Sequence, residues 1–230
     1  MTRRESLAES LTSTTVAVLG GTGPQGRGLA RRFADAGLPV VIGSRSAERA
    51  EGIAAELAEA TGGTVTGQDN EGAARAADVV IVAVPWDGHG DLLTGLAEAL
   101  AGKIVVDCVN PLGFDKQGPF VLDVDEGSAA QQAAALLPDS TVVAAFHNVS
   151  AVKLEDPEVT EVDTDVLVLG EGEDREACDL VQDLAATIPG VRGVYGGRLR
   201  NAHQVEALTA NLIAINRRHK AHAGIRITDI

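Results

Sequence analysis

The chain has 230 residues, of which 45% are hydrophobic and only 3% aromatic, and its formal net charge at pH 7 is −14. This length is enough for one large domain with a full core, or for one domain with a small companion. The acidic balance argues against nucleic-acid binding, and no apolar run approaches the ~20 residues that a membrane span requires. The two cysteines, Cys108 and Cys178, form no metal or redox motif and suit a reducing compartment. We therefore expect a cytoplasmic protein that binds neither nucleic acid nor membranes.

Residues 15–146 alternate between strand-like and helix-like segments. The strands that we predict are Val16–Gly20, Val40–Gly43, a short one at Val65, Asp78–Val84, Ile104–Asp107 and Thr141–Phe146. The helices that we predict are Pro24–Ala36, one that ends near Ala60, Asn70–Ala77, Asp91–Ala101 and Ser128–Leu137, and residues 110–127 are predicted to form a loop. Such alternation favours a parallel sheet with helices on both faces. We expect an α/β fold with a Rossmann-type, doubly wound parallel sheet.

The remaining segments are less regular. We predict an irregular stretch over His147–Val162, a strand over Asp165–Gly170, a helix over Asp174–Thr187, an extended piece over Val191–Tyr195 and a long helix over about Asn201–Ala221. We therefore divide the chain into a flexible N-terminal tail at residues 1–14, a Rossmann domain at residues 15–146 and a smaller C-terminal α/β part at residues 147–230. We expect the C-terminal part to pack directly on the sheet.

A glycine motif lies between the first predicted strand and the first predicted helix. Its core is Gly21-Thr22-Gly23-Pro24-Gln25-Gly26. In this G-x-G-x-x-G arrangement the glycines allow a tight turn, a close approach of the backbone to a pyrophosphate and close packing of helix on strand. The helix N-terminus adds free N–H groups for the phosphates. The motif predicts a dinucleotide site, and the alternative is a glycine-rich turn that only packs.

The second predicted strand ends in Gly43-Ser44-Arg45, where an NAD site usually has a carboxylate for the ribose 2′-hydroxyl. Arg45 offers a planar cation that suits a 2′-phosphate. Ser44 adds a hydroxyl, and Arg49 lies one helical turn further along. We therefore predict NADP rather than NAD. The alternative is that Ser46 caps the next helix and both arginines are only solvated.

Candidates for chemistry lie at the carboxyl ends of the later strands, where ligands bind in α/β folds. These ends carry Val84-Pro85-Trp86, Asn110-Pro111 and His147-Asn148-Val149, and a nicotinamide should lie among them. His147 is the candidate catalytic residue, as a hydrogen-bond donor to a cofactor, and a capping or core histidine is the alternative. His219 and His222 share a helix face but lack a third ligand, so we predict a solvated helix end and no metal site.

The C-terminal segment Gly190–Ile230 is basic, with seven Lys/Arg against two Asp/Glu. On an acidic protein such a segment would receive an anionic ligand or dock on an acidic neighbouring subunit. Alternatively, its cations would only complement a helix dipole.

The order and spacing of these motifs resemble the F420-dependent NADP oxidoreductases. The stretches that carry the resemblance are Gly20–Ala30, Val41–Arg45, Val84–Trp86, Phe146-His147 and Val205–Thr209, and together they extend over nearly the whole chain after Thr14. The resemblance implies reversible hydride transfer between NADP(H) and coenzyme F420, an 8-hydroxy-5-deazaflavin with an anionic tail. It also implies a homodimer, in which the C-terminal part serves F420 binding and dimerisation.

The resemblance also implies roles for individual residues. Residues 22–25 would contact the pyrophosphate, and Ser44, Arg45 and Arg49 would hold the 2′-phosphate. Val84 and Pro85 would line the nicotinamide site, whereas His147, Val149 and Ala151 would flank the meeting point of the two rings. The stretch Ala223–Ile225 would help to seat the deazaflavin. The full predicted cofactor-binding set, besides His147, is Gly21, Thr22, Gly23, Pro24, Gln25, Gly26, Ser44, Arg45, Arg49, Val84, Pro85, Trp86, Asn110, Asn148, Val149, Ala151 and Ala223.

Three alternative functions stay open at this point. An NADP-dependent reductase of a small imine or hydroxy acid would need a proton donor beside its substrate, and Lys153 is the candidate. A noncatalytic NADP(H) sensor would bind the nucleotide without turnover. A flavin would replace the deazaflavin in a third alternative, since the two rings have similar shapes.

Overall fold

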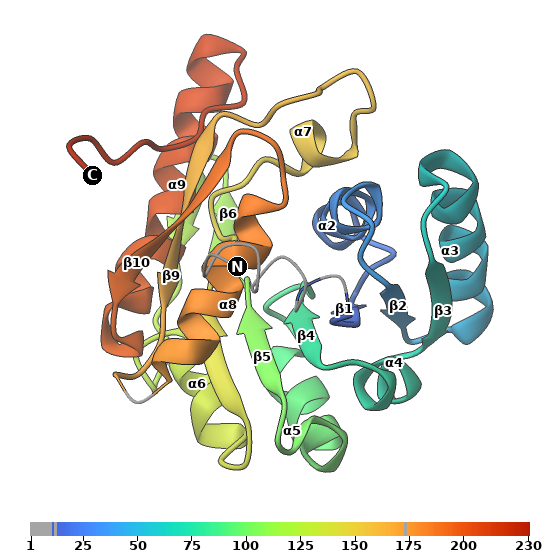
Figure 1. Ribbon diagram of the computed structural model, residues 1–230. Coiled ribbons are helices and arrows are strands. Elements are labelled where there is room, and N and C mark those ends of the chain that lie inside the picture. Colours follow the sequence, from blue (N-terminus) through green and yellow to red (C-terminus); the bar gives the residue numbers. More distant parts are fainter. Residues whose placement is uncertain (1–10, 12, 173) are drawn as a thin grey trace.

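A computed structural model of the protein describes residues 11, 13–172 and 174–230 (Figure 1). Most of the predicted N-terminal tail, residues 1–14, lies outside the described residues. Of its described residues, Leu11 is buried in the hydrophobic core.

One eight-stranded sheet organises the molecule. Its strands, in spatial order, are β10 (Val191–Gly197), β9 (Thr164–Leu169), β8 (Thr141–Ala144), β5 (Ile104–Asp107), β4 (Val79–Val82), β1 (Val16–Leu19), β2 (Val40–Ser44) and β3 (Val65–Asp69). All neighbours pair in parallel except β8 and β9, which meet antiparallel at Ala144 and Leu169. Figure 1 shows β3 at one edge of the sheet and β10 at the other.

Helices cover both faces of the sheet, because alternate strand residues point to opposite sides. Val16 and Val18 face one hydrophobic cluster, together with α2 (Pro24–Asp35), α3 (Ala47–Thr61) and α8 (Arg175–Ala186). Ala17 and Leu19 face the other cluster, together with α4 (Asn70–Ala76), α5 (His89–Leu100), α6 (Ala129–Leu136) and α9 (Ala202–His219). The predicted Rossmann-type, doubly wound α/β fold is thereby confirmed.

The C-terminal part continues the same sheet through β9 and β10 as well as packing on it. The chain leaves β8, forms the short helix α7 (Ala151–Glu155) and returns antiparallel as β9. Arg32 of α2 holds this connection, because its guanidinium donates to the carbonyl oxygens of Lys153, Leu154, Asp156 and Val159. These bonds fasten α7 to α2, and β9 then enters the sheet antiparallel to β8.

The expected loop over residues 110–127 is wrong over two short strands within residues 112–121. Residues 112–121 form an antiparallel hairpin of β6 (Leu112–Asp115) and β7 (Gly118–Val121). Glycine and proline suggested a loop, but Pro119 sits opposite Phe114 on a short two-stranded ribbon, where proline is tolerated. The ring of Phe120 occupies the space where Gly113 has no side chain. The expectation that His147–Val162 is irregular likewise missed α7, which is only five residues long.

None of the described helices is long and apolar enough to cross a membrane. The carboxyl ends of the parallel strands meet along one edge of the sheet, where the glycine motif and the later strand ends also lie.

Candidate functional site

The glycine motif forms a tight turn between β1 and α2. Gly20 has a φ of 73°, a conformation that favours glycine. A Cβ on Gly26 would lie 2.7 Å from the carbonyl oxygen of Gly20, so this glycine allows helix and turn to pack. At Gly23 the nearest atom to an added Cβ is 3.4 Å away, and no described side chain caps α2 there. The turn therefore presents an open backbone surface and a free helix N-terminus, which suit a phosphate group.

The carboxyl end of β2 lies directly beside this turn, since the N–H of Gly21 donates to the carbonyl oxygen of Gly43 at 3.1 Å. Ser44 is buried there, whereas Arg45 and Arg49 are exposed and form no ion pair with any residue described. Ser46 caps α3, because its hydroxyl accepts from the N–H of Arg49 at 3.3 Å. The cap and a phosphate contact are compatible, since the cap uses the Ser46 hydroxyl and the backbone N–H of Arg49 and leaves both guanidinium groups exposed.

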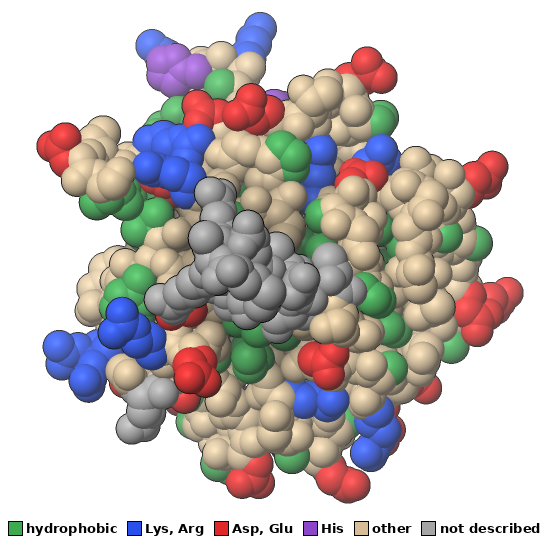
Figure 2. All heavy atoms as spheres, in the orientation of Figure 1, with side chains coloured by type: hydrophobic (Ala, Val, Ile, Leu, Met, Phe, Trp, Pro, Cys, Tyr) green, Lys and Arg blue, Asp and Glu red, His purple; other side chains and the backbone are tan. Residues whose placement is uncertain are grey.

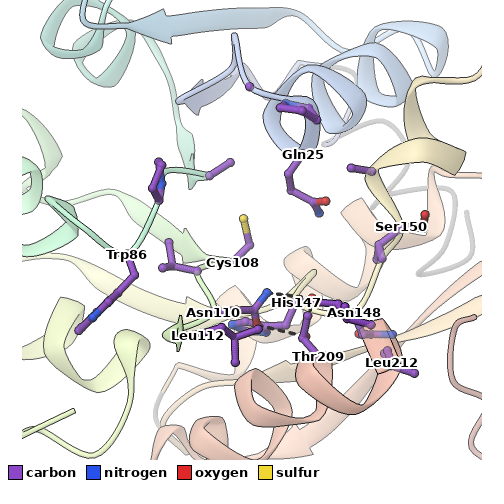
Figure 3. Close-up of a pocket in the computed structure, with 18 of the residues that line it drawn as sticks. Gln25, Trp86, Cys108, Asn110, Leu112, His147, Asn148, Ser150, Thr209 and Leu212 are labelled. Atoms are coloured by element: carbon purple, nitrogen blue, oxygen red, sulfur yellow. Dashed lines mark hydrogen bonds between the residues drawn. The ribbon is translucent and has the colours of Figure 1, made fainter. Parts of the chain in front are cut away.

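A cavity of about 620 Å³ opens at the same edge of the sheet (Figure 3). One side, which we call the turn wall, consists of Gly23, Pro24 and Gln25. The opposite side, which we call the helix wall, consists of Thr209, Leu212, Ile213 and Asn216 of α9. The segments that follow β4, β5 and β8 lie between the two walls, and residues 112 and 114 of the hairpin and Ala223 complete the lining. The lining residues after the three strands are Ala83, Val84, Pro85, Trp86, Asp87, Cys108, Val109, Asn110, His147, Asn148, Val149, Ser150 and Ala151.

His147 reaches this cavity through an uncommon backbone conformation. The preceding residue, Phe146, has a φ of 64°, which is strained for a bulky side chain and redirects the chain as it leaves the sheet. His147 is 3% exposed, and neither ring nitrogen has a hydrogen-bond partner among the described residues. The buried Oδ1 of the neighbouring Asn148 also lacks one. Buried polar atoms without partners are rare, so these three atoms are candidates for hydrogen bonds to a ligand.

Burial lowers the pKa of His147 to about 4, although the charge of Asp107 opposes the shift. The ring is therefore neutral at pH 7. A neutral imidazole has one donor and one acceptor nitrogen, so it can orient a polar ring substituent without adding charge to the cavity.

Hydrogen bonds join the helix wall to the strand ends. The carbonyl oxygen of His147 accepts from Asn110 Nδ2 at 3.1 Å and from Thr209 Oγ1 at 2.9 Å. Thr209 also lies 3.2 Å from Asn110 Oδ1, so three separate elements meet at one point (Figure 3). This junction fixes α9 against the sheet and thereby sets the width of the cavity.

A buried charged pair supports the strand ends from beneath. His89 and Asp107 are both fully buried, and Nε2 of the histidine lies 2.6 Å from Oδ2 of the aspartate. Nδ1 of His89 faces Gln132 Oε1 at 3.0 Å, so both ring nitrogens face acceptors, which favours the imidazolium form. Burial would lower the pKa of His89, but the hydrogen bond and charge of Asp107 outweigh burial and raise that pKa.

This pair touches the cavity lining on two sides. Oδ1 of Asp107 accepts from the N–H of Val109 at 3.0 Å, which fixes the segment after β5. The ring of His89 lies 5.4 Å from the ring of Trp86, centre to centre. Glu206 of α9 is buried nearby and accepts from the N–H groups of Ala129 and Ala130, at the start of α6. Burial raises the pKa of Glu206 to about 7.

The C-terminal residues form a strap that ends the cavity. Ala223 N–H donates to Asn216 Oδ1 at 2.7 Å, and the N–H of Asp165 donates to the carbonyl oxygen of Ile225 at 2.8 Å. The fully buried Asp165 pairs with Arg192 and Arg226 and also accepts from the N–H of Ile227. The hydrogen bond from Arg192 is the main reason that the pKa of Asp165 is lowered far below its usual value.

Comparisons with known proteins identify the family of this chain. A family model described as NADP oxidoreductase coenzyme F420-dependent matches residues 15–111. The F420-dependent NADP reductase of Methanothermobacter marburgensis is 42% identical over 224 residues, which cover 94% of this chain and 98% of that protein. This chain belongs to the F420-dependent NADP reductase family. The F420-dependent NADP reductase of Methanocaldococcus jannaschii is 40% identical over 94% of this chain and 98% of that protein.

Solved structures show the same fold. A putative F420-dependent NADP reductase from an Arthrobacter species superposes with a TM-score of 0.78 at 26% identity, over 94% of this chain and all of that chain. A pyrroline-5-carboxylate reductase from Coxiella burnetii has a TM-score of 0.61 at 17% identity, over 90% of this chain and 67% of that one, and shows likeness of fold alone.

The structure brings twelve of the predicted site residues together around the cavity. They are Gly23, Pro24, Gln25, Val84, Pro85, Trp86, Asn110, His147, Asn148, Val149, Ala151 and Ala223. The others, Gly21, Thr22, Gly26, Ser44, Arg45 and Arg49, lie outside the cavity lining, in the turn or at the end of β2 and the start of α3. Lys153, the candidate donor for an imine or hydroxy-acid reductase, does not line the cavity either. His219 and His222 are exposed.

Sequence reasoning missed the helix wall and the buried polar groups. Thr209, Leu212 and Asn216 follow one another at helical spacing on one face of α9, which is a detectable signal. The apolar stripe of Val205, Leu208, Leu212 and Ile215 has the spacing of a core face, but only part of it is buried, since Ile215 is 44% exposed. The pair of His89 and Asp107 joins residues 18 positions apart, and no local pattern signals it.

Proposed function

We propose that this protein transfers a hydride reversibly between NADP(H) and coenzyme F420, with both cofactors bound in the one cavity and no covalent intermediate. The observation that carries the proposal is the character of the cavity lining. It extends from a phosphate-binding type of turn to a second wall on α9, and only three side chains that line it titrate.

These three side chains are poorly suited to general acid catalysis near neutral pH. His147 is neutral, burial raises the pKa of the Cys108 thiol, and Asp87 is an exposed carboxylate at the rim. A reductase of imines or hydroxy acids would need a proton donor at its substrate. Hydride transfer between two bound rings needs mainly alignment and exclusion of water.

We assign NADP(H) to the turn wall and the end of β2. The free N-terminus of α2 and the open backbone at Gly23 would receive the pyrophosphate. Arg45 and Arg49, with Ser44, would hold the 2′-phosphate, since no carboxylate stands at the end of β2 to repel it. Val84 and Pro85 would then border the nicotinamide.

We assign the deazaflavin to the side of the cavity next to the helix wall. When both cofactors are bound, the nicotinamide ring donates or accepts the hydride and the deazaflavin ring is its counterpart. His147 would orient a ring by a neutral hydrogen bond, and the apolar side chains of Leu212 and Ile213 would exclude water. In this assignment residues 15–146 bind the nucleotide and residues 147–230 complete the site for F420.

The proposal also includes the oligomeric state and the cellular location of the protein. We propose a homodimer, supported by the exposed apolar side chains of Phe114 and Phe120 on the hairpin, which are 63% and 45% exposed. Light scattering should give about twice the chain mass of 23.7 kDa, and a monomer mass would contradict the dimer.

We also propose a cytoplasmic location, which suits the unpaired, buried Cys108 and Cys178.

The function is tested by mixing the purified protein with NADPH and oxidised F420 and following the visible absorbance of the deazaflavin. We expect enzyme-dependent bleaching with NADPH and slower bleaching with NADH. Bleaching of FMN but not of F420 would favour a flavin reductase. Binding of NADPH without turnover of F420 or FMN would favour the sensor and contradict the proposal.

A further inference from the structure

The C-terminal end of α9 gathers positive charge on a protein whose net charge is −14. Arg217, Arg218 and Lys220 are exposed there, and none of them forms an ion pair with any other residue in the described part of the chain. Figure 2 shows Lys, Arg and His side chains at the top of the molecule, where α9 ends in Figure 1. We call Arg217, Arg218 and Lys220 the basic helix end.

The basic helix end adjoins the mouth of the cavity. Asn216 belongs to the helix wall and directly precedes Arg217. Lys220 lies one turn beyond Asn216, and its backbone N–H donates to the carbonyl oxygen of Asn216. It terminates α9 in a left-handed conformation, with a φ of 51°, and the chain then folds back so that Ala223 joins the lining.

Two side chains of this region lie near opposite sides of the cavity. Arg217 extends over the hairpin, where its Nη1 lies 3.4 Å from the position that a Cβ on Gly118 would take. His222 Nδ1 lies 3.4 Å from Ser150 Oγ, on the side of α7, and Ser150 lines the cavity. Cationic or protonatable side chains therefore border the mouth from the hairpin across to α7.

This positive charge has no role in the assignment of NADP(H), because that assignment places the pyrophosphate at the turn wall and the 2′-phosphate at the end of β2. We infer that the basic helix end binds the anionic tail of F420 as it leaves the cavity. The inference rests on the proposed function and adds a subsite that distinguishes the tailed cofactor from its bare ring.

The opposing explanation is that the three cations only complement the dipole of α9, which is worth about 0.3–1 kcal/mol for each such charge. That explanation predicts an effect on stability alone. A tail subsite predicts an effect on the affinity for tailed F420 alone, and one that weakens as salt screens exposed charges.

The test is the triple variant Arg217→Gln, Arg218→Gln, Lys220→Gln, in the full chain. Equilibrium dialysis gives the Kd of F420, of a tail-free deazaflavin ribitol and of NADPH. We expect the Kd of F420 to rise about tenfold in low salt, because each exposed pair contributes only about 0.2–1 kcal/mol. The Kd values of the tail-free compound and of NADPH should not change.

A matched control removes three positive charges at the opposite end of α9 and nearby, with Arg175→Gln, Arg198→Gln and Arg200→Gln. The helix has 18 residues, so this end lies about 27 Å away at 1.5 Å per residue. This variant should keep the wild-type Kd for F420. An equal loss of F420 affinity in both variants would show a general effect of net charge and would overturn the subsite.

An unchanged Kd for F420 in the triple variant Arg217→Gln, Arg218→Gln, Lys220→Gln would also overturn the tail subsite. If the wild type still reduces F420 in that case, the proposed function stands without the subsite. Failure of the wild type to bind either deazaflavin would instead contradict the proposed function and the subsite together.

Discussion

The two walls of the cavity are built on different physical principles. The turn wall is made of backbone: glycines at 20, 23 and 26 shape it, and its attraction for phosphate comes from free N–H groups at the start of α2. The helix wall is made of side chains of α9, and hydrogen bonds among Asn110, His147 and Thr209 hold it against strand ends from distant parts of the chain. The first wall depends on backbone geometry and on close packing at Gly26, whereas the second depends on a buried polar network.

Among the changes that test this difference between the two walls, Asp107→Ala should have the largest effect on stability. The change leaves the buried imidazolium of His89 unpaired and frees the N–H of Val109, so the free energy of unfolding should fall by about 3–5 kcal/mol. Urea denaturation measures it. Asp107→Asn, which keeps the shape, should lose less, and a loss below about 1 kcal/mol in the alanine variant would contradict a charged pair.

The pH dependence of stability should distinguish two buried groups beside the helix wall. Because the pKa of His147 is about 4 in the folded protein and near 6.5 when unfolded, the unfolded state binds more protons between pH 4 and 6.5. Stability therefore rises with pH in that window, by up to about 3 kcal/mol. For Glu206, the pKa of about 7 exceeds the usual 4.5, so its contribution falls as pH rises from 4.5 to 7.

These two trends oppose each other in the wild type and separate in variants. Because the two shifts are of similar size, the free energy of unfolding from these groups should change little between pH 4.5 and 6.5 in the wild type, fall in His147→Gln and rise in Glu206→Gln, as measured by denaturation at both pH values. Identical slopes in all three proteins would contradict these pKa directions.

On the turn wall, two glycines should respond differently to the same substitution. In Gly26→Ala the new Cβ would meet backbone at 2.7 Å, so stability should fall by about 1–3 kcal/mol. In Gly23→Ala the Cβ has room within the protein, with its nearest atom at 3.4 Å, so stability should stay unchanged while the affinity for NADPH falls. Unfolding curves and the Kd of NADPH measure both effects, and equal stability losses would be inconsistent with this assignment.

The smallest effect should come from Arg45→Ala at the end of β2. Losing one charge-assisted contact should raise the KM for NADPH about tenfold and leave the KM for NADH nearly unchanged. Ser44→Glu should move the preference toward NADH, since it supplies an acceptor for the ribose and repels a phosphate. Steady-state kinetics with both nucleotides provides the check. Equal losses for NADPH and NADH in Arg45→Ala would remove the 2′-phosphate assignment.

The contrast between the walls also explains what could be predicted from sequence. Gly21 to Gly26 lie in one local turn, and Ser44 and Arg45 follow a strand, so local spacing predicts where they lie. His147 and Asn110 were predicted because strand ends of a parallel sheet meet at one edge. The helical spacing of Thr209, Leu212 and Asn216 signals a shared face of α9 but not what that face contacts, and the pair of His89 and Asp107 depends on how separate elements pack, for which short-range patterns carry no signal. The hairpin was missed because its glycines and prolines are equally common in loops.

The central claim is that the two cofactors meet in one cavity and exchange a hydride directly. Reduction of F420 by NADPH deuterated at the nicotinamide C4 position tests it, with the deuterium followed by NMR or mass spectrometry in ordinary water. Direct transfer predicts deuterium from one face of the nicotinamide at C5 of the reduced deazaflavin, with the accompanying proton taken from solvent. Solvent hydrogen at C5, with the label lost to water from either face, would contradict the claim.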